Sequence, residues 1–298
     1  MTTTPTRERP SRRLFRRREA LAGFLFVLPA ALLFLVFRLA PVVGGFAVSV
    51  LDVKITGAFE FVGLKNFARL VNDPSFWQSF WVTVIYTVLV VPLLMAISIG
   101  LALLVRRVAP FIKFFRAAFF IPSITSLVLA GAVFVWVFNA GGAIPRLMEI
   151  LGGDGRSWLS HPALALIAVV VVAVWGRFGF DMLIVLARLQ DLPREIDEAA
   201  MVDGASAWQR FWYITFPQLK PVLFFLMVIE TTFSFQVFDV VYVLTGGGPS
   251  GATNVLGLLL YHEAFQLFHF GYAAAIGVAM CILLVIMAAI QRLILDRD

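Results

Sequence analysis

Residues 198–221 read EAAMVDGASAWQRFWYITFPQLKP, the longest amphipathic, charged segment in an otherwise apolar second half of the chain. Long hydrophobic runs lie on both sides, so we expect this segment to form a loop at a membrane surface. A helical pattern ends at Asp203-Gly204, and a second, aromatic-rich helical piece is closed by Pro217 and Pro221. A loop that only connected two membrane helices would not need this order. We therefore interpret the segment as a docking element for a partner.

The composition of the whole chain indicates a membrane protein. Of its 298 residues, 61% are hydrophobic and 14% are charged, whereas a soluble domain is about half apolar and a quarter charged. The net charge of +6 is explained better by arginines near membrane ends than by a nucleic-acid partner. The single Cys281 cannot form an intrachain disulfide, and the three histidines lack metal-ligand spacing. We expect neither a metal site nor nucleic-acid binding.

Six apolar runs are long enough to cross a membrane, which requires about 20 residues. The first follows an arginine-rich start and is too long for a cleaved signal peptide, so we expect it to be retained. The sequence predicts an all-α integral membrane protein, with an arginine-rich tail at 1–20 and a six-helix domain at 21–298. The expected spans are Leu21–Val50, Val82–Val105, Phe115–Phe138, Leu164–Ala187, Val222–Leu244 and Tyr272–Leu293.

The distribution of basic residues predicts the orientation of these spans, because cytoplasmic loops carry an excess of lysine and arginine. Seven arginines precede the first run, and the segments 106–116 and 188–221 contribute four basic residues each. The connections on the opposite side hold five. We therefore expect both termini and the loop at 188–221 to be cytoplasmic.

The order of residues in the central loop suits contact with a protein. Proline disfavours helix at the preceding residue, so Pro193 ends the span before the loop. Glu195 and Asp197 then lie in the first turn of a new helix, where acidic groups interact favourably with its dipole. Ala199 and Ala200 leave a small-residue face that a partner can approach closely. Gly204 can adopt positive φ and end this helix.

The loop resembles the cytoplasmic loop that is characteristic of ATP-binding-cassette importer permeases. The matching residues are EAA at 198–200, DGA at 203–205 and FWYITFP at 211–217. Four further stretches are similar to the carbohydrate-uptake branch, whose subunits are maltose-permease-like and depend on a binding protein. These are FVGLKNF at 61–67, DPSFW at 73–77, TGGGP at 245–249 and FGYAAAI at 270–276. The resemblance covers Leu21 to Leu293.

The resemblance implies a MetI-like, type I importer permease core in a prokaryotic plasma membrane. It implies a second permease subunit, with a heterodimer favoured, an ATPase subunit dimer and an extracytoplasmic solute-binding protein, all beside membrane lipid. The chain has no Walker A pattern, so ATP and Mg belong to the ATPase partner, and we expect no enzyme activity or cofactor here. The residues implied to couple to the ATPase are Glu198, Ala199, Ala200, Asp203, Gly204, Ala205, Phe211 and Pro217.

Charged residues within the predicted spans mark candidate functional positions, because each costs roughly 2.5–3.5 kcal/mol at mid-membrane. Arg177 and Asp181 are four residues apart and could pair on one helix face, as a structural ion pair or as part of a ligand site. Glu230 and Asp239 would face opposite directions on an ideal helix. At most one of them is expected to line a pathway unless that helix is broken.

The resemblance implies that Arg177, Phe180, Glu230 and Ser234 face the transported sugar, and Asp181 joins this candidate pathway. Charged groups occupy positions where the family has amide and glycine residues, so maltose itself is in doubt, and a phosphorylated or otherwise charged sugar derivative stays open. Two other classes also stay open. One is an ATP-independent carrier or channel. The other is a membrane-embedded glycosyl-transfer enzyme that would use the acidic residues of the central loop.

Overall fold

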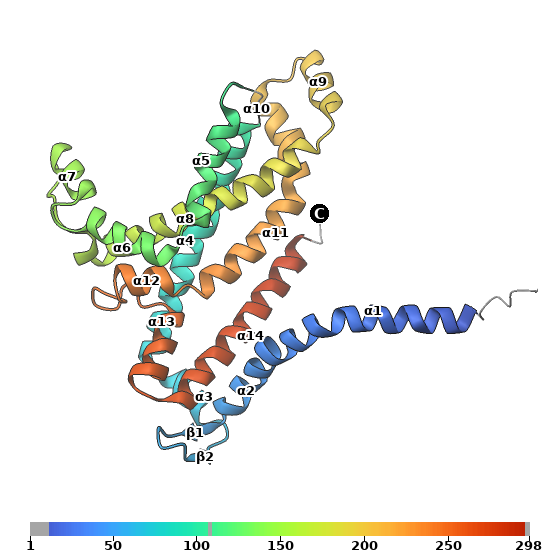
Figure 1. Cartoon of the computed structure of the whole chain (residues 1–298). Helices are drawn as coiled ribbons and strands as arrows, with labels where there is room; N and C mark the ends of the chain where they lie inside the picture. The colour runs from blue at the N-terminus through green and yellow to red at the C-terminus, as the bar shows by residue number, and fades with distance from the viewer. Residues whose placement is uncertain (1–11, 107–108, 296–298) are drawn as a thin grey trace, which may run out of the picture.

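The computed structural model describes residues 12–106 and 109–295. The described residues are helical apart from one two-stranded hairpin and the connecting turns (Figure 1). Six of their helical segments are long and apolar enough to cross a membrane, which confirms the predicted class. Arg7, Arg9, Arg107 and Arg297, which contribute to the predicted orientation, lie outside the described residues.

The first span packs against α14 through its C-terminal part, whereas its N-terminal part leads away from the other helices (Figure 1). It consists of α1 (Arg12–Phe34), a π-helical turn (Leu35–Leu39) and α2 (Ala40–Ser49). The helix thus begins within the segment predicted as a tail. Most apolar side chains from Leu21 to Phe46 are exposed. Such a surface is stable against lipid or another apolar helix, but not against water.

A small hairpin follows the first span and joins it to the second. Strands β1 (Leu51–Val53) and β2 (Phe59–Phe61) are antiparallel, and α3 (Lys65–Asn72) and α4 (Pro74–Val105) come next. The Asn66 side-chain amide donates hydrogen bonds to the carbonyls of Ser49 and Leu51, both at 2.9 Å. The FVGLKNF stretch therefore fixes the end of the first span against the start of α3.

The third apolar run is not one helix, so the predicted continuous span Phe115–Phe138 is wrong. It forms α5 (Ile112–Ile124) and α6 (Leu127–Phe138), and α7 (Ala143–Ile150) follows. Thr125 and Ser126 have extended backbone conformations at the break. Pro122 lies inside α5, two residues before the helix ends, and has no N–H to donate to the carbonyl of Ala118. As a result α6 runs at an angle to α5 (Figure 1).

The fifth run is also broken, and the predicted continuous span Val222–Leu244 is wrong. A short π-helical turn (Phe211–Thr215) leads into α11 (Phe216–Phe235), which ends before α12 (Asp239–Leu244). The remaining elements in this half follow the predicted order. They are a 3-10 turn (Trp158–Ser160), α8 (Pro162–Gln190), α9 (Arg194–Val202), α10 (Ala207–Arg210), α13 (Leu256–Tyr261), a π-helical turn (His262–Gln266) and α14 (Phe270–Leu295).

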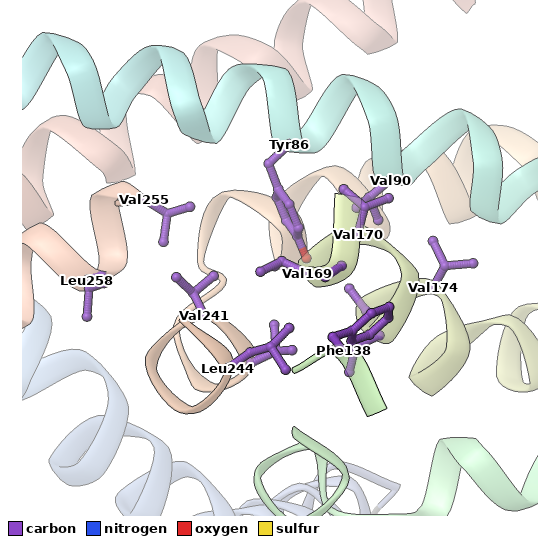
Figure 2. Packing of buried hydrophobic residues seen from close by; sticks show 14 of the residues in the cluster. Tyr86, Val90, Phe138, Val169, Val170, Val174, Val241, Leu244, Val255 and Leu258 are labelled. Atoms are coloured by element: carbon purple, nitrogen blue, oxygen red, sulfur yellow. The ribbon is translucent and has the colours of Figure 1, made fainter. Parts of the chain in front are cut away.

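The largest apolar core lies where α4 and α8 pack along each other and α6 and α12 close over them. Figure 2 shows Tyr86 extending from α4 toward Val169 of α8, with Phe138, Val241 and Leu244 around them. This core fixes the position of α8 next to the part of the helix that carries buried polar side chains.

Candidate functional site

A buried ion pair joins α8 to α11. Arg177 Nε donates to Glu230 Oε2 at 2.6 Å, and a terminal guanidinium nitrogen of Arg177 donates to Glu230 Oε1 at 2.5 Å. The Glu230 side chain is 1% exposed and that of Arg177 is 25% exposed. The guanidinium also lies 4.1 Å from the centre of the Phe233 ring. The charge of Arg177 is therefore satisfied within the chain, in the two-point geometry that makes such pairs strong.

Two glycines bring the helices close enough to set the position of Arg177. A side chain at Gly179 would meet the backbone carbonyl of Phe119 on α5, and one at Gly176 would meet Leu127 on α6. Two serines add polar links between the helices. Ser98 of α4 donates to the carbonyl of Phe178 at 3.3 Å, and the Phe180 N–H donates to Ser123 Oγ of α5 at 3.0 Å.

The ion pair borders a cavity of about 150 Å³. The break after α11 places Asp239, the first residue of α12, on the same cavity as Glu230. The opposite directions were expected only for an unbroken helix, and here the chain reorients through Gln236–Phe238 instead of continuing as an ideal helix. The lining consists of Tyr86, Val90, Leu127, Ala173, Arg177, Glu230, Phe233, Ser234, Gln236, Val237, Phe238, Asp239 and Val240.

The structure brings some of the predicted pathway residues together and separates others. Arg177, Glu230 and Ser234 line the cavity. Asp181 is fully buried on α8 but does not line it, and Arg177 pairs with Glu230 instead of Asp181. Phe180 also lies outside the lining, with 44% of its surface exposed. Tyr86 was missed because a tyrosine in an apolar run carries no signal of its own.

The predicted docking loop forms a corner that projects from the helices (Figure 1). Helix α9 ends at Val202, and Gly204 follows with a φ of +81°, in the left-handed region that favours glycine. The corner is closed by the Ala205 N–H, which donates to the carbonyl of Ala200 at 2.9 Å. Helix α10 then begins with a capping box. The Gln209 N–H donates to Ser206 Oγ at 3.3 Å, and the Ser206 N–H donates to Gln209 Oε1 at 2.8 Å.

Ionic and aromatic contacts stiffen this corner. Arg210 Nε lies 3.4 Å from Asp197 Oδ1, which links the two arms of the corner. The rings of Trp208 and Trp212 are 5.6 Å apart, and Trp212 is 5.0 Å from Phe216 at the start of α11. A displacement of the corner would thus be transmitted to α11.

The outer surface of the corner is exposed. Among the predicted coupling residues, Ala200, Ala205 and Phe211 are half-buried, whereas the others are exposed. Met201 is 48% exposed and Val202 is 88% exposed. Apolar side chains presented together with acidic groups on a projecting helix are typical of a contact surface. Among the described residues, His, Cys, Asp and Glu form no group of three that could hold a metal ion.

Comparison with known proteins gives consistent results. Residues 109–297 match the family model described as binding-protein-dependent transport system inner membrane component. The chain is 36% identical to the trehalose/maltose transport system permease protein MalF of Thermococcus litoralis, over 89% of this chain and 90% of that protein. It is 32% identical to the sulfoquinovosyl glycerol transport system permease protein SmoG of Agrobacterium fabrum, over 94% and 92%. A crystal structure of a bacterial transporter that imports alginate has the same fold, with a TM-score of 0.84 at 22% identity, covering 96% of this chain and 99% of that one.

Proposed function

The chain belongs to the family of inner membrane components of binding-protein-dependent transport systems, and we propose that it forms part of a pathway for a neutral, hydroxyl-rich sugar. It is a multi-pass permease subunit of an ATP-binding-cassette importer for sugar-like solutes, and ATP hydrolysis occurs in a separate subunit. The relatives give no support to an ATP-independent carrier or to a glycosyl-transfer enzyme.

The observation that carries the proposed role of this subunit in the importer is the projecting corner formed by α9 and α10. A helix that only connected two spans would gain stability by packing on the bundle, whereas α9 presents most of its side chains to the outside. Gly204, the capping box and the Arg210–Asp197 ion pair hold its shape. We assign this corner, within residues 188–221, as the element that docks on a cytoplasmic ATPase dimer. This assignment puts both chain termini in the cytoplasm.

In this mechanism the corner is a lever between nucleotide state and pathway access. ATP, with Mg, binds to the ATPase subunits and closes their dimer, which moves α9 and, through the aromatic contacts of Trp212, shifts α11. Because α11 carries Glu230 and Ser234, its movement changes the walls of the cavity. Hydrolysis reverses the movement. The permease is then an element with two states that the ATPase biases.

Further partners follow from the same assignment. A solute-binding protein would deliver cargo on the side that carries the β1–β2 hairpin and α3, opposite the α9 corner (Figure 1). A second permease subunit would complete the pathway, as a heterodimer because two different walls can surround an asymmetric sugar. The exposed apolar side chains of the first span would contact lipid or that subunit.

The charge balance of the cavity favours a neutral cargo. Arg177 is held by Glu230 and Phe233, and the remaining ionisable carboxylate in the lining is Asp239. A phosphate or sulfonate would meet no unpaired cation among these lining residues. Sugar hydroxyls, in contrast, can hydrogen-bond to Ser234, Gln236 and Tyr86 beside the Phe238 ring.

The assignment of the corner is tested by reversing the charge of Glu198 in the complete transporter. Glu198→Lys is expected to abolish sugar uptake and to weaken co-purification of the ATPase subunit, while the protein still inserts into the membrane. Glu60→Lys, which changes an exposed glutamate on β2, is the matched control and should retain ATPase binding. Wild-type uptake by Glu198→Lys at normal expression would overturn the docking role.

A further inference from the structure

Asp181 has a position that the Arg177–Glu230 ion pair does not explain. Its side chain is fully buried within a membrane-spanning helix, and neither carboxylate oxygen has a hydrogen-bond partner among the described residues. It lies four residues after Arg177 on α8, on the same face of the helix. The guanidinium of Arg177 binds Glu230 and leaves this second buried carboxylate without a partner among the described residues.

The spacing of Arg177 and Asp181 allows them to pair without moving their helix. Side chains four residues apart on a helix lie above one another, because helical side chains lean toward the N-terminal end. Asp181 therefore leans toward the turn that carries Arg177. Only a change in the rotamer of Arg177 is needed to transfer its guanidinium from α11 to Asp181 on its own helix.

A hydrogen bond, here called the tie, joins α8 and α11 at one end. The two helices can therefore separate at the level of Glu230 by tilting about that end. Arg188 Nε donates to the carbonyl of Gln218 at 3.1 Å and holds the two helices together near the α9 corner. At 1.5 Å per residue, Arg177 and Glu230 lie roughly 16–18 Å from this tie. If the helices tilt about the tie by about 10°, the pair separates by about 3 Å, and rotations of this size are ordinary in switching proteins.

We propose that Arg177 exchanges partners during the transport cycle, leaving Glu230 and pairing with Asp181 when α8 and α11 separate. This proposal rests on the proposed function, because ATP-driven movement of the α9 corner supplies the tilt. The exchange keeps the guanidinium of Arg177 paired with a carboxylate in both states, so the arginine charge is never left without a partner inside the span. Asp181 is then a positioning residue that acts through Arg177 and does not contact the cargo.

The exchange predicts that the two carboxylates favour opposite states. Asp181→Asn weakens the separated state and should shift the equilibrium about tenfold toward the Arg177–Glu230 pair, since a hydrogen bond between charged groups is lost only there. Glu230→Gln should shift it in the other direction by a similar factor. A structural role for both residues would instead lower folded yield in both variants, without opposite shifts.

The experiment uses the complete transporter reconstituted in vesicles, with the ATPase subunit, the second permease and the binding protein. The helix separation is measured from spin labels at Val171 of α8 and Ile229 of α11 in a Cys281→Ser background, with and without ATP. Asp181→Asn should reduce the separated population and sugar uptake, and Glu230→Gln should increase the separated population before ATP is added. Asp154→Asn, at an exposed aspartate between α7 and α8, is the matched control.

The outcomes distinguish this inference from the proposed function. If the wild type takes up sugar with ATP but Asp181→Asn has the same separated population, or both variants shift it in one direction, the exchange is wrong and the proposed function stands. If the wild type shows no ATP-dependent uptake, the proposed function is wrong and the exchange falls with it. Opposite shifts in the two variants support the exchange.

Discussion

Arg177 and Glu230 show why buried charges in a membrane protein must be judged as pairs. Either group alone would be expensive in an apolar span, but together they form two short hydrogen bonds at the edge of the cavity. The sequence indicates both positions, because charged residues are rare in these runs. It cannot indicate the pairing, since Asp181 is the nearer candidate along the chain and α11 must be placed before Glu230 becomes a neighbour.

A first prediction separates the structural and functional parts of this pair. Glu230→Ala leaves a buried guanidinium unpaired and should lower the free energy of unfolding by about 3–5 kcal/mol. Arg177→Met combined with Glu230→Leu removes both charges and should recover most of that stability. Melting temperatures in detergent measure this, and the double variant should still transport poorly if the pair acts in the cycle. Equal destabilisation by the single and double variants would contradict the interpretation.

A second prediction concerns the close approach at Gly179. Any side chain there would meet the carbonyl of Phe119, so Gly179→Val should separate α8 from α5 and reduce the folded yield strongly. Gly100→Ala on α4 is the matched control, because a side chain there meets nothing within 4 Å. Replacing this helical glycine should stabilise the protein by about 0.5–1 kcal/mol. Size-exclusion profiles of the two variants provide the comparison, and a normal profile for Gly179→Val would show that this approach is dispensable.

Among the helices and strands, the spans themselves could be predicted and their breaks could not. An apolar run reveals the length available for crossing a membrane, but α5–α6 and α11–α12 show that one run can contain two helices. The α11–α12 break, through Gln236–Phe238, has no proline to announce it. The turn of the α9 corner, in contrast, was predictable, because its glycine and acidic first turn act locally, whereas the breaks depend on packing against other helices. The expectation that Pro217 and Pro221 close the second helical piece is wrong, because Pro217 lies in the first turn of α11, Pro221 lies inside it, and the helix continues from Ala207 to Phe235.

The capping box of α10 gives a third prediction. Ser206→Ala removes the side chain that accepts the Gln209 N–H and should cost the helix about 1 kcal/mol. Amide hydrogen exchange should therefore become faster in α10 and in the turn at Phe211–Thr215. Ser160→Ala, an exposed serine that caps no helix in the structure, is the control. Unchanged exchange in α10 would mean that other contacts of the corner determine its shape.

A fourth prediction concerns the contact between the start of α4 and α14. Asp73 accepts hydrogen bonds from the Tyr272 hydroxyl at 2.5 Å and from the Ser75 N–H at 2.8 Å. Partial burial by itself would raise the pKa of Asp73, but these bonds and Arg69 outweigh it and hold the pKa below its ordinary value of 3.8. Because the folded-state pKa is lowered, the stabilisation is complete well above pH 3.8 and is lost as pH falls through the folded value.

Tyr272→Phe tests this contact. The variant should have a lower melting temperature at pH 7, and its difference from the wild type should shrink as the pH falls below about 3.8, where Asp73 becomes protonated. Tyr213→Phe, at an exposed tyrosine, serves as the control. A difference in melting temperature that stays constant from pH 7 to pH 3 would contradict the role given to the Asp73 carboxylate.

For the whole molecule, the sequence indicates the class and the side of each surface, but not how the parts move together. The exposed apolar first span and the projecting corner show that this chain has two surfaces that only other components can cover. The composition and the loop motif predict both. What required the structure is the path between them: α11 begins at the corner and ends at the cavity, so one helix connects docking with the candidate cargo site.

The central claim is that the α9 corner transmits ATP-driven movement, and paired glycines test it most directly. Gly204 and Gly57 have φ values of +81° and +82°, and the N–H of each donates a turn hydrogen bond. Proline at either position destroys the local turn to the same degree, but Gly57 lies in the hairpin at the opposite end of the molecule. The measurement is sugar uptake together with ATP hydrolysis in vesicles that contain the complete transporter. Gly204→Pro should abolish sugar uptake and uncouple it from ATP hydrolysis, whereas Gly57→Pro should leave uptake coupled to hydrolysis. Wild-type uptake that is still coupled to ATP hydrolysis in Gly204→Pro would contradict the claim.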